Sequence, residues 1–257
     1  PVAMAGARPQ WLSLSLILEE GVPVQDLARI LDTIRDRAQE AKVAVVCGDT
    51  KVVERGQADG VYINTAGIGV VPDGVACAAQ NARPGDRILL SGAVGLHGLA
   101  VLLAREDLGL SSPVTSDVAP LNGVVASLID AGVPLHAMRD LTRGGLATAL
   151  HEIAKSAAVS MELEEERIPS IEAQQAACDL LGLDPLHVAC EGRFVAVVPP
   201  EDADTALAVM RGCPVAREAA CVGTVREQDR HPLELVTTVG TRRVLTMPRG
   251  EQMPRIC

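Results

Sequence analysis

The sequence is poor in aromatic residues, because its 257 residues include one Trp, one Tyr and one Phe. Proteins that bind single-stranded nucleic acids usually stack the bases on aromatic side chains. Basic residues are also outnumbered, with 23 Lys and Arg against 33 Asp and Glu, and the formal net charge is −10. This charge would repel a polyanion, although it leaves room for a small phosphate pocket. We therefore expect no nucleic-acid partner.

Long apolar runs are missing as well. A transmembrane helix needs about 20 mostly apolar residues, and the longest candidate, Trp11–Leu18, is interrupted by two serines and followed by two glutamates. The first residues contain neither the basic start nor the apolar centre of a signal peptide. We expect no membrane association and a cytoplasmic protein.

The seven cysteines include no pair at the short spacing of a zinc or redox motif. Scattered, odd-numbered cysteines are typical of free thiols in a reducing compartment, and we expect six of them to lie in or near the core. The seventh, Cys257, ends the chain on the stretch 247–257, where two prolines and a glycine disfavour regular structure. A thiol on such an arm could travel between sites, although for the residue alone an accidental cysteine at a frayed end is the simpler explanation.

Hydrophobic periodicity predicts an α+β chain with two layered domains and a boundary near residue 80. Before the boundary we expect strands at 11–16, 43–46 and 61–71 and a helix at 24–42. Beyond it we expect a C-terminal domain, 81–246, and a flexible tail, 247–257. Its predicted helices are 97–107, 118–131, 145–157, 171–181 and 201–211, and its predicted strands are 87–91, 134–138, 159–163, 193–198, 219–226 and 242–246. Several strands alternate polar and apolar residues, which favours mixed or antiparallel sheets with helices packed on one face.

An acid and a lysine follow the predicted buried strand 43–46. Asp49 and Lys51 belong to a turn-like stretch that begins with a glycine. Asp49 could hold Mg²⁺ and Lys51 could neutralise a phosphate. A charged turn with a surface ion pair explains the same residues equally well.

Small and polar residues precede the predicted helix 145–157. Gly144 and Gly145 would leave the free backbone N–H groups of a helix start open to an anion, and Asp140 could sit on a metal that bridges this anion. Taken alone, a capped helix with Thr142 as its N-cap is the better explanation. The glycine-lysine-serine/threonine ending of a Walker A loop is absent.

Two further polar residues stand at the edges of predicted elements. Glu191 precedes an apolar strand, and a buried carboxylate is costly unless it is solvated, paired or protonated. Glu191 is therefore a candidate general base, although pairing with Arg193 is an equally simple explanation. His97 opens the predicted helix 97–107. It could be a ligand or an acid, although packing against a neighbour is the simpler role.

Seven segments together carry a resemblance that none of them carries alone. They are Gly6–Pro9, Ile17–Gly21, Gly48–Val53, Asn64–Gly67, Asp140–Gly145, Glu191–Gly192 and Pro254–Cys257. The Asp-x-Thr-x-Gly-Gly element is similar to that of aminoimidazole ribonucleotide synthetase, selenophosphate synthetase and thiamine-monophosphate kinase. With its Pro-Arg-Ile-Cys ending, the chain resembles the family of the hydrogenase maturation factor HypE over essentially its whole length.

This resemblance implies an activity in [NiFe]-hydrogenase maturation. A HypF-type carbamoyltransferase would place a carbamoyl group on Cys257, and the protein, an ATP-dependent carbamoyl dehydratase and thus a lyase, would dehydrate it to a thiocyanate. The cyano group would then pass to iron on a HypC–HypD complex. The resemblance implies that Lys51 stabilises the transferring phosphoryl group and that Glu191 takes a proton from the amide nitrogen.

The resemblance also implies a binding site and an assembly. Asp49 and Asp140 would place Mg²⁺, and ATP would be bound by Asp49, Thr50, Lys51, Asp140, Thr142, Gly144 and Gly145. Domain 1–80 would be the remainder of an ATP-binding and dimerisation domain, and the strand 11–18 would contribute to a homodimer.

Related chains begin further upstream, so we expect this chain to lack part of that domain and to bind Mg-ATP poorly by itself. The alternatives are a small-molecule kinase or synthetase of the same superfamily and a non-catalytic carrier.

Overall fold

The computed structural model describes residues 1–105 and 112–247 and divides them into two compact units. The smaller unit consists of Val2 and Ala7–Asp73, and the larger one of Pro1, Ala3–Gly6 and the chain from Gly74 onward. The division falls at Gly74 rather than near residue 80, because residues 74–81 pack with the larger unit. In that stretch the backbone N–H of Ala78 donates to the carbonyl of His136 at 3.0 Å. In the described ranges no helix is long and apolar enough to cross a membrane.

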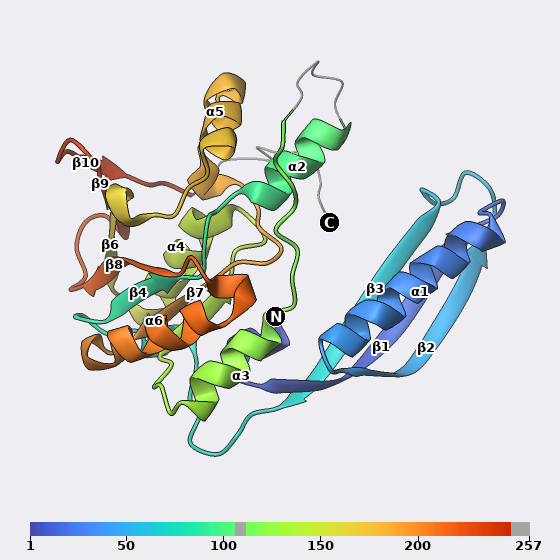
Figure 1. Cartoon of the computed structure of the whole chain (residues 1–257), viewed down its shortest axis with the longest axis horizontal. Helices are drawn as coiled ribbons and strands as arrows, with labels where there is room; N and C mark the ends of the chain where they lie inside the picture. Colours follow the sequence, from blue (N-terminus) through green and yellow to red (C-terminus); the bar gives the residue numbers. More distant parts are fainter. Residues whose placement is uncertain (106–111, 248–257) are drawn as a thin grey trace. The chain divides into compact units, whose positions relative to one another are not determined.

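The smaller unit is a three-stranded sheet with one helix (Figure 1). The central strand β1 (Arg8–Glu19) pairs in parallel with β2 (Ala44–Val53) and antiparallel with β3 (Val61–Val70). Helix α1 (Val24–Glu40) connects β1 to β2 and packs against β2. The three predicted strands and the helix are confirmed, and β1 and β2 extend beyond the predicted ranges.

Much of the apolar surface of this unit is exposed in the single chain. The prediction of a buried strand at 43–46 is wrong, since the side chain of Val46 is 59% exposed. The residue belongs to β2, which is an edge strand of this sheet. On β1, Leu16 and Leu18 are buried, whereas Ile17, which points to the opposite face, is 40% exposed. Other exposed apolar side chains of β1 and β3 are Trp11, Tyr62, Ile63, Ile68 and Val70. A cluster of exposed apolar side chains of this kind often marks a site of interaction with another protein chain.

The larger unit contains a seven-stranded sheet in the order β10-β9-β6-β8-β4-β7-β5. All neighbouring strands are antiparallel except β6 and β9, which are parallel. The strands are β4 (Arg87–Leu90), β5 (Ala137–Asp140), β6 (Ser160–Glu164), β7 (Phe194–Val198), β8 (Ala220–Arg226), β9 (Leu233–Val236) and β10 (Arg242–Val244). The short strand β9 was not predicted.

Apolar cores lie on both faces of this sheet, so the prediction of helices on one face only is wrong here. On β4, Ile88 and Leu90 belong to the core that includes α4, whereas Leu89 belongs to the core that includes α3 and α6. Because β4 and β7 are apolar on both faces, each face requires its own layer of helices. The helices are α2 (Leu96–Arg105), α3 (Asn122–Asp130), α4 (Gly145–Ala157), α5 (Glu172–Leu181) and α6 (Ala203–Gly212).

One predicted helix begins late. The range 118–131 contains α3, but the helix starts at Asn122 and residues 112–121 are irregular. Pro120 disfavours a helical conformation for the residue before it, and the side chain of Asp117 accepts hydrogen bonds from the turn at Glu191–Gly192. The predicted end of the helix 97–107 lies outside the described residues.

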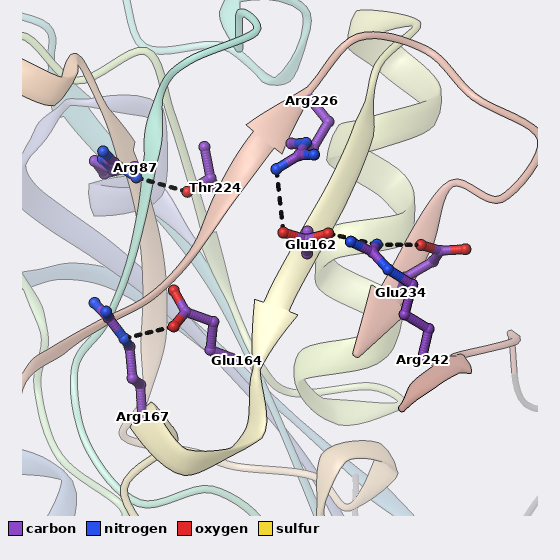
Figure 2. A network of polar contacts seen from close by, with 8 residues as sticks. All are labelled: Arg87, Glu162, Glu164, Arg167, Thr224, Arg226, Glu234 and Arg242. Atoms are coloured by element: carbon purple, nitrogen blue, oxygen red, sulfur yellow. Dashed lines mark hydrogen bonds and ion pairs between the residues drawn. The ribbon is translucent and has the colours of Figure 1, made fainter. Parts of the chain in front are cut away.

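Ion pairs cover the outer strands on one face of the sheet (Figure 2). Glu162 on β6 accepts a hydrogen bond from Arg226 on β8 at 3.1 Å and pairs with Arg242 on β10, which also donates to Glu234 on β9 at 2.9 Å. Since exposed ion pairs contribute only about 0–1 kcal/mol each, we interpret this network as a polar cover for the strands rather than as their main source of stability.

Candidate functional site

In the larger unit, three segments meet at the turn that carries Glu191. The backbone N–H of Glu191 donates to Oδ1 of Asp117 at 2.8 Å. The N–H of Cys190 donates to the carbonyl of Leu141 at 2.9 Å, and Cys190 Sγ accepts the N–H of Gly95 at 3.0 Å. The turn is thereby fixed to the segment before α3, the connection after β5 and the loop before α2.

Asp140 and Thr142 form a local pair at the end of β5. The Thr142 hydroxyl donates to Oδ1 of Asp140 at 3.0 Å, and the backbone nitrogen of Pro1 lies 3.5 Å from Oδ2 of Asp140. Thr142 is therefore not the N-cap of α4, contrary to the simpler sequence interpretation. The N-cap is Gly144, and among the described residues no side chain caps the first N–H groups of the helix. A helix start without a side-chain cap can offer these donors to an anion.

Glycines allow the site segments to approach one another closely. Gly145 has a φ of 62°, and a Cβ there would lie 2.6 Å from the carbonyl oxygen of Leu186 and 2.7 Å from that of Val188. A Cβ on Gly192 would lie 1.8 Å from the carbonyl oxygen of Asp117. Any side chain at either position would force the backbones apart.

Glu191 is half-buried, and its surroundings favour the protonated form. Burial raises the pKa of Glu191; the positive field of His97 opposes this effect, and the carboxylates of Asp117 and Asp140 reinforce it. The alternative role as a partner of Arg193 is wrong, because the Arg193 guanidinium donates to backbone carbonyls, among them those of Ala93 (3.1 Å) and Val215 (2.8 Å). A carboxylate with a raised pKa inside a polar site is a candidate general base.

His97 contacts a polar neighbour, as the sequence predicted. Its Nδ1 lies 2.8 Å from the hydroxyl of Ser116, the residue before Asp117. The contact links the first turn of α2 to the irregular segment before α3.

The smaller unit holds the second set of candidate residues. The sequence placed Asp49 and Lys51 just past the end of a buried strand, with a charged turn as the alternative. Both are wrong, because the two residues lie within β2, where they pair with Ser15 and Ile17 of β1. Strand alternation places Asp49 and Lys51 on one face and Thr50 on the other. Oδ1 of Asp49 accepts the N–H of Thr50 at 2.8 Å.

The predicted site residues thus fall into two groups, one in each unit. Cys257 lies outside the described residues. Asp117 was missed, since no motif in its neighbourhood relates it to a glutamate 74 positions later.

The described residues contain no preformed metal site of three protein ligands. No group of three His, Cys, Asp or Glu side chains within residues 1–105 and 112–247 could hold a metal ion. Mg²⁺ usually takes one or two protein carboxylates and completes its shell with phosphate and water. The carboxylates of Asp49 and Asp140 have the chemistry of such ligands.

Comparison with known proteins identifies the family. The N-terminal domain family of AIR synthase related proteins matches residues 2–71, and the corresponding C-terminal domain family matches residues 83–236. Carbamoyl dehydratase HypE of Cupriavidus necator is 50% identical over 256 residues, which cover all of this chain and 73% of that protein. The chain belongs to the HypE family.

Solved HypE structures share the fold. The crystal structure of a HypE in complex with ATP has a TM-score of 0.94 and 43% identity, covering all of this chain and 78% of the other. The structure of a HypE–HypF complex has a TM-score of 0.92 and 42% identity, covering 95% of this chain and 80% of the other. The resemblance to HypE and the two-domain α+β fold that it implied are both confirmed.

Proposed function

We propose that this protein is an ATP-dependent carbamoyl dehydratase of [NiFe]-hydrogenase maturation, which converts a carbamoyl group on the Cys257 thiol into a thiocyanate. The relative from Cupriavidus necator is named carbamoyl dehydratase HypE, and one similar HypE structure was determined in complex with ATP. Within this chain, the observation that carries the proposal is Glu191. This half-buried carboxylate has a raised pKa and lies where three segments meet.

The reaction needs both a leaving group and a base. The carbamoyl group loses one oxygen and two protons when it becomes a thiocyanate, and an amide oxygen leaves poorly. When bound, ATP supplies a phosphoryl group with which this oxygen departs as phosphate. We assign to Glu191 the acceptance of one proton from the amide nitrogen, because a raised pKa brings its proton affinity closer to the working pH. The other proton leaves with the oxygen on the phosphate.

The nucleotide and its metal ion require cationic, anionic and N–H groups. We assign Lys51 to the charge that develops on the transferring phosphoryl group and the carboxylates of Asp49 and Asp140 to Mg²⁺. In the part of the chain that the structure describes, the start of α4 has no side-chain cap, which supports a phosphate-binding role for its N–H groups. The other residues that we assign to the nucleotide are Thr50, Thr142, Gly144 and Gly145.

The proposed partners follow the order of the group transfer. A HypF-type carbamoyltransferase would load Cys257, as supported by the similarity to the HypE–HypF complex structure. A HypC–HypD complex would receive the cyano group. The exposed apolar side chains of β1 and β3 support a homodimer formed through the smaller unit.

Glu191→Gln tests the assigned base. The amide keeps the size of the side chain but cannot take up the proton, so the variant should accept a carbamoyl group and then accumulate the thiocarboxamide. We expect dehydration to slow by about 10²–10⁴-fold, measured by rapid quenching and mass spectrometry of the C-terminal peptide. Glu166→Gln, a change at an exposed glutamate, is the matched control. Thiocyanate formation at the wild-type rate in Glu191→Gln would remove Glu191 from the mechanism.

A further inference from the structure

Asp117 is a buried acid in the irregular segment between α2 and α3, and its side chain is directed at a single backbone turn. The residue is 8% exposed. Its Oδ1 accepts the N–H of Glu191 at 2.8 Å and the N–H of Gly192 at 3.3 Å. Its Oδ2 is buried and has no hydrogen-bond partner in the described part of the chain.

Close packing fixes the distance between this segment and the turn. A Cβ on Gly192 would lie 1.8 Å from the carbonyl oxygen of Asp117 and 2.9 Å from the backbone nitrogen of Ala119. On its other side, Asp117 follows Ser116, whose hydroxyl lies 2.8 Å from Nδ1 of His97. The segment is therefore held on both sides and can act as a fixed support for the Glu191 backbone.

A carboxylate is an unfavourable choice if the only purpose is stability. A buried carboxylate oxygen without a partner opposes folding, and the nearby carboxylate of Glu191 adds like-charge repulsion. A neutral acceptor would satisfy the same two N–H groups without these penalties. The side chain of Asp117 nevertheless provides one acceptor oxygen to both N–H groups, and these bonds hold the Glu191 turn.

We propose that Asp117 is a positioning residue that holds the Glu191–Gly192 turn in the place from which the Glu191 side chain takes the substrate proton. This inference rests on the proposed role of Glu191. A displacement of about 1 Å at a reacting group can reduce a rate by about 10²-fold. Loss of the Asp117 acceptor should therefore slow dehydration and leave carbamoyl transfer to the tail intact.

Hydrogen exchange tests the geometry without relying on activity. In Asp117→Ala the N–H groups of Glu191 and Gly192 lose their acceptor, and we expect their exchange to accelerate by about tenfold or more. Asp117→Asn keeps an acceptor oxygen in the same place and should exchange close to the wild-type rate. Asp204→Ala, a change at an exposed acid of α6, is the control. Exchange in Asp117→Ala at the wild-type rate would overturn the inference.

The rate of dehydration tests the effect of this positioning on the reaction. We expect Asp117→Ala to dehydrate about 10²-fold more slowly than the wild type. We expect the rate of Asp117→Asn to lie within about threefold of the wild type, since its amide oxygen still accepts both hydrogen bonds. Carbamoyl transfer and the KM for ATP should be unchanged in both variants. Three results would overturn the inference: wild-type dehydration in the Ala variant, an Asn variant as slow as the Ala variant, or equal loss of transfer and dehydration.

The Glu191→Gln variant, assayed in parallel, separates this inference from the proposed function. If Glu191→Gln dehydrates normally, the base assignment fails, and the positioning role fails with it. If Glu191→Gln is slow and Asp117→Ala is normal, only the inference about Asp117 fails.

Discussion

At the scale of single residues, the pH dependence of dehydration reports on Glu191. Burial raises its pKa, with support from Asp117 and Asp140 and opposition from His97. A general base acts only when it is deprotonated, so the rate should fall as the pH decreases through this raised pKa and level off above it. The acid limb should lie above the ordinary value of 4.5.

Single-turnover dehydration measured as a function of pH provides the test for Glu191. The residual rate of Glu191→Gln should lack this acid limb, which makes the variant an internal control. A wild-type rate that stays constant down to the range of an ordinary glutamate would contradict the predicted shift.

The sequence could single out residues whose chemistry is visible locally. Glu191 stands before an apolar strand, and Gly145 opens a helix, so both were predicted as parts of a site. Asp117 could not be found, because its partners lie more than seventy positions away. Cys47 was expected in or near the core and is exposed. It lies in β2, an edge strand of the small sheet, and local sequence does not show which elements cover a strand.

At the scale of elements, the turn at residues 184–187 fastens β10 to the body of the larger unit. Oδ2 of Asp184 accepts a hydrogen bond from Arg243 of β10 at 2.7 Å, and Oδ1 accepts the N–H of Leu186 at 3.0 Å. Partial burial alone would raise the pKa of Asp184, but hydrogen bonds from His187, Leu186 and Arg243 outweigh it and hold the pKa well below its usual range.

This depressed pKa gives the stability a defined pH dependence. A carboxylate with a lowered folded-state pKa contributes stability above its unfolded-state pKa and loses this contribution as the pH falls toward the folded-state value. We expect Asp184→Asn to reduce the free energy of unfolding by about 1 kcal/mol near neutral pH, a modest value because Arg243 is partly exposed. The difference from the wild type should shrink below about pH 4, since the unfolded-state pKa is about 3.9.

Urea denaturation at neutral and acidic pH measures this difference for Asp184→Asn. Asp204→Asn, which changes an exposed acid, serves as the control. An equal loss of stability at both pH values would show that the ionised form of Asp184 is not what stabilises the turn.

Most elements could be predicted because their periodicity is local, and the exceptions have physical reasons. β9 consists of four residues, and its existence depends on parallel pairing with β6. The irregular stretch 112–121 was partly assigned to a helix, because its contacts with the Glu191 turn are distant in sequence. Helices cover both faces of the larger sheet, since the central strands are apolar on both sides.

At the scale of the whole molecule, the exposed apolar face of the smaller unit predicts self-association. Trp11 pairs with Ile68 in the sheet, and their side chains are 42% and 63% exposed. A stable interface buries about 800 Å² per partner, and a charge placed within it opposes association. We therefore expect the wild type to be a dimer and Trp11→Glu to be a monomer.

Sedimentation equilibrium measures this association, and circular dichroism checks that the variant is folded. Val24→Glu is the matched control, because Val24 is 79% exposed at the start of α1 rather than on β1 or β3. A wild type that stays monomeric, or a Trp11→Glu variant that remains dimeric, would exclude this face as the dimer interface.

The central claim, that Cys257 carries the reacting group, is tested most directly by intact-protein mass spectrometry. The protein is incubated with a HypF-type carbamoyltransferase, carbamoyl phosphate and ATP. Its mass should rise by one carbamoyl group and then fall by one water, and both changes should map to Cys257. Competing thiols are disfavoured, because burial raises the pKa values of Cys77 and Cys178 to about 11, and only a thiolate reacts readily.

Two variants make this measurement decisive. Cys257→Ala should gain no mass, whereas Cys47→Ala, which removes an exposed thiol of the smaller unit, should be modified like the wild type. Two results would contradict the account: a carbamoyl gain in Cys257→Ala, or a wild-type protein that gains no carbamoyl group on Cys257.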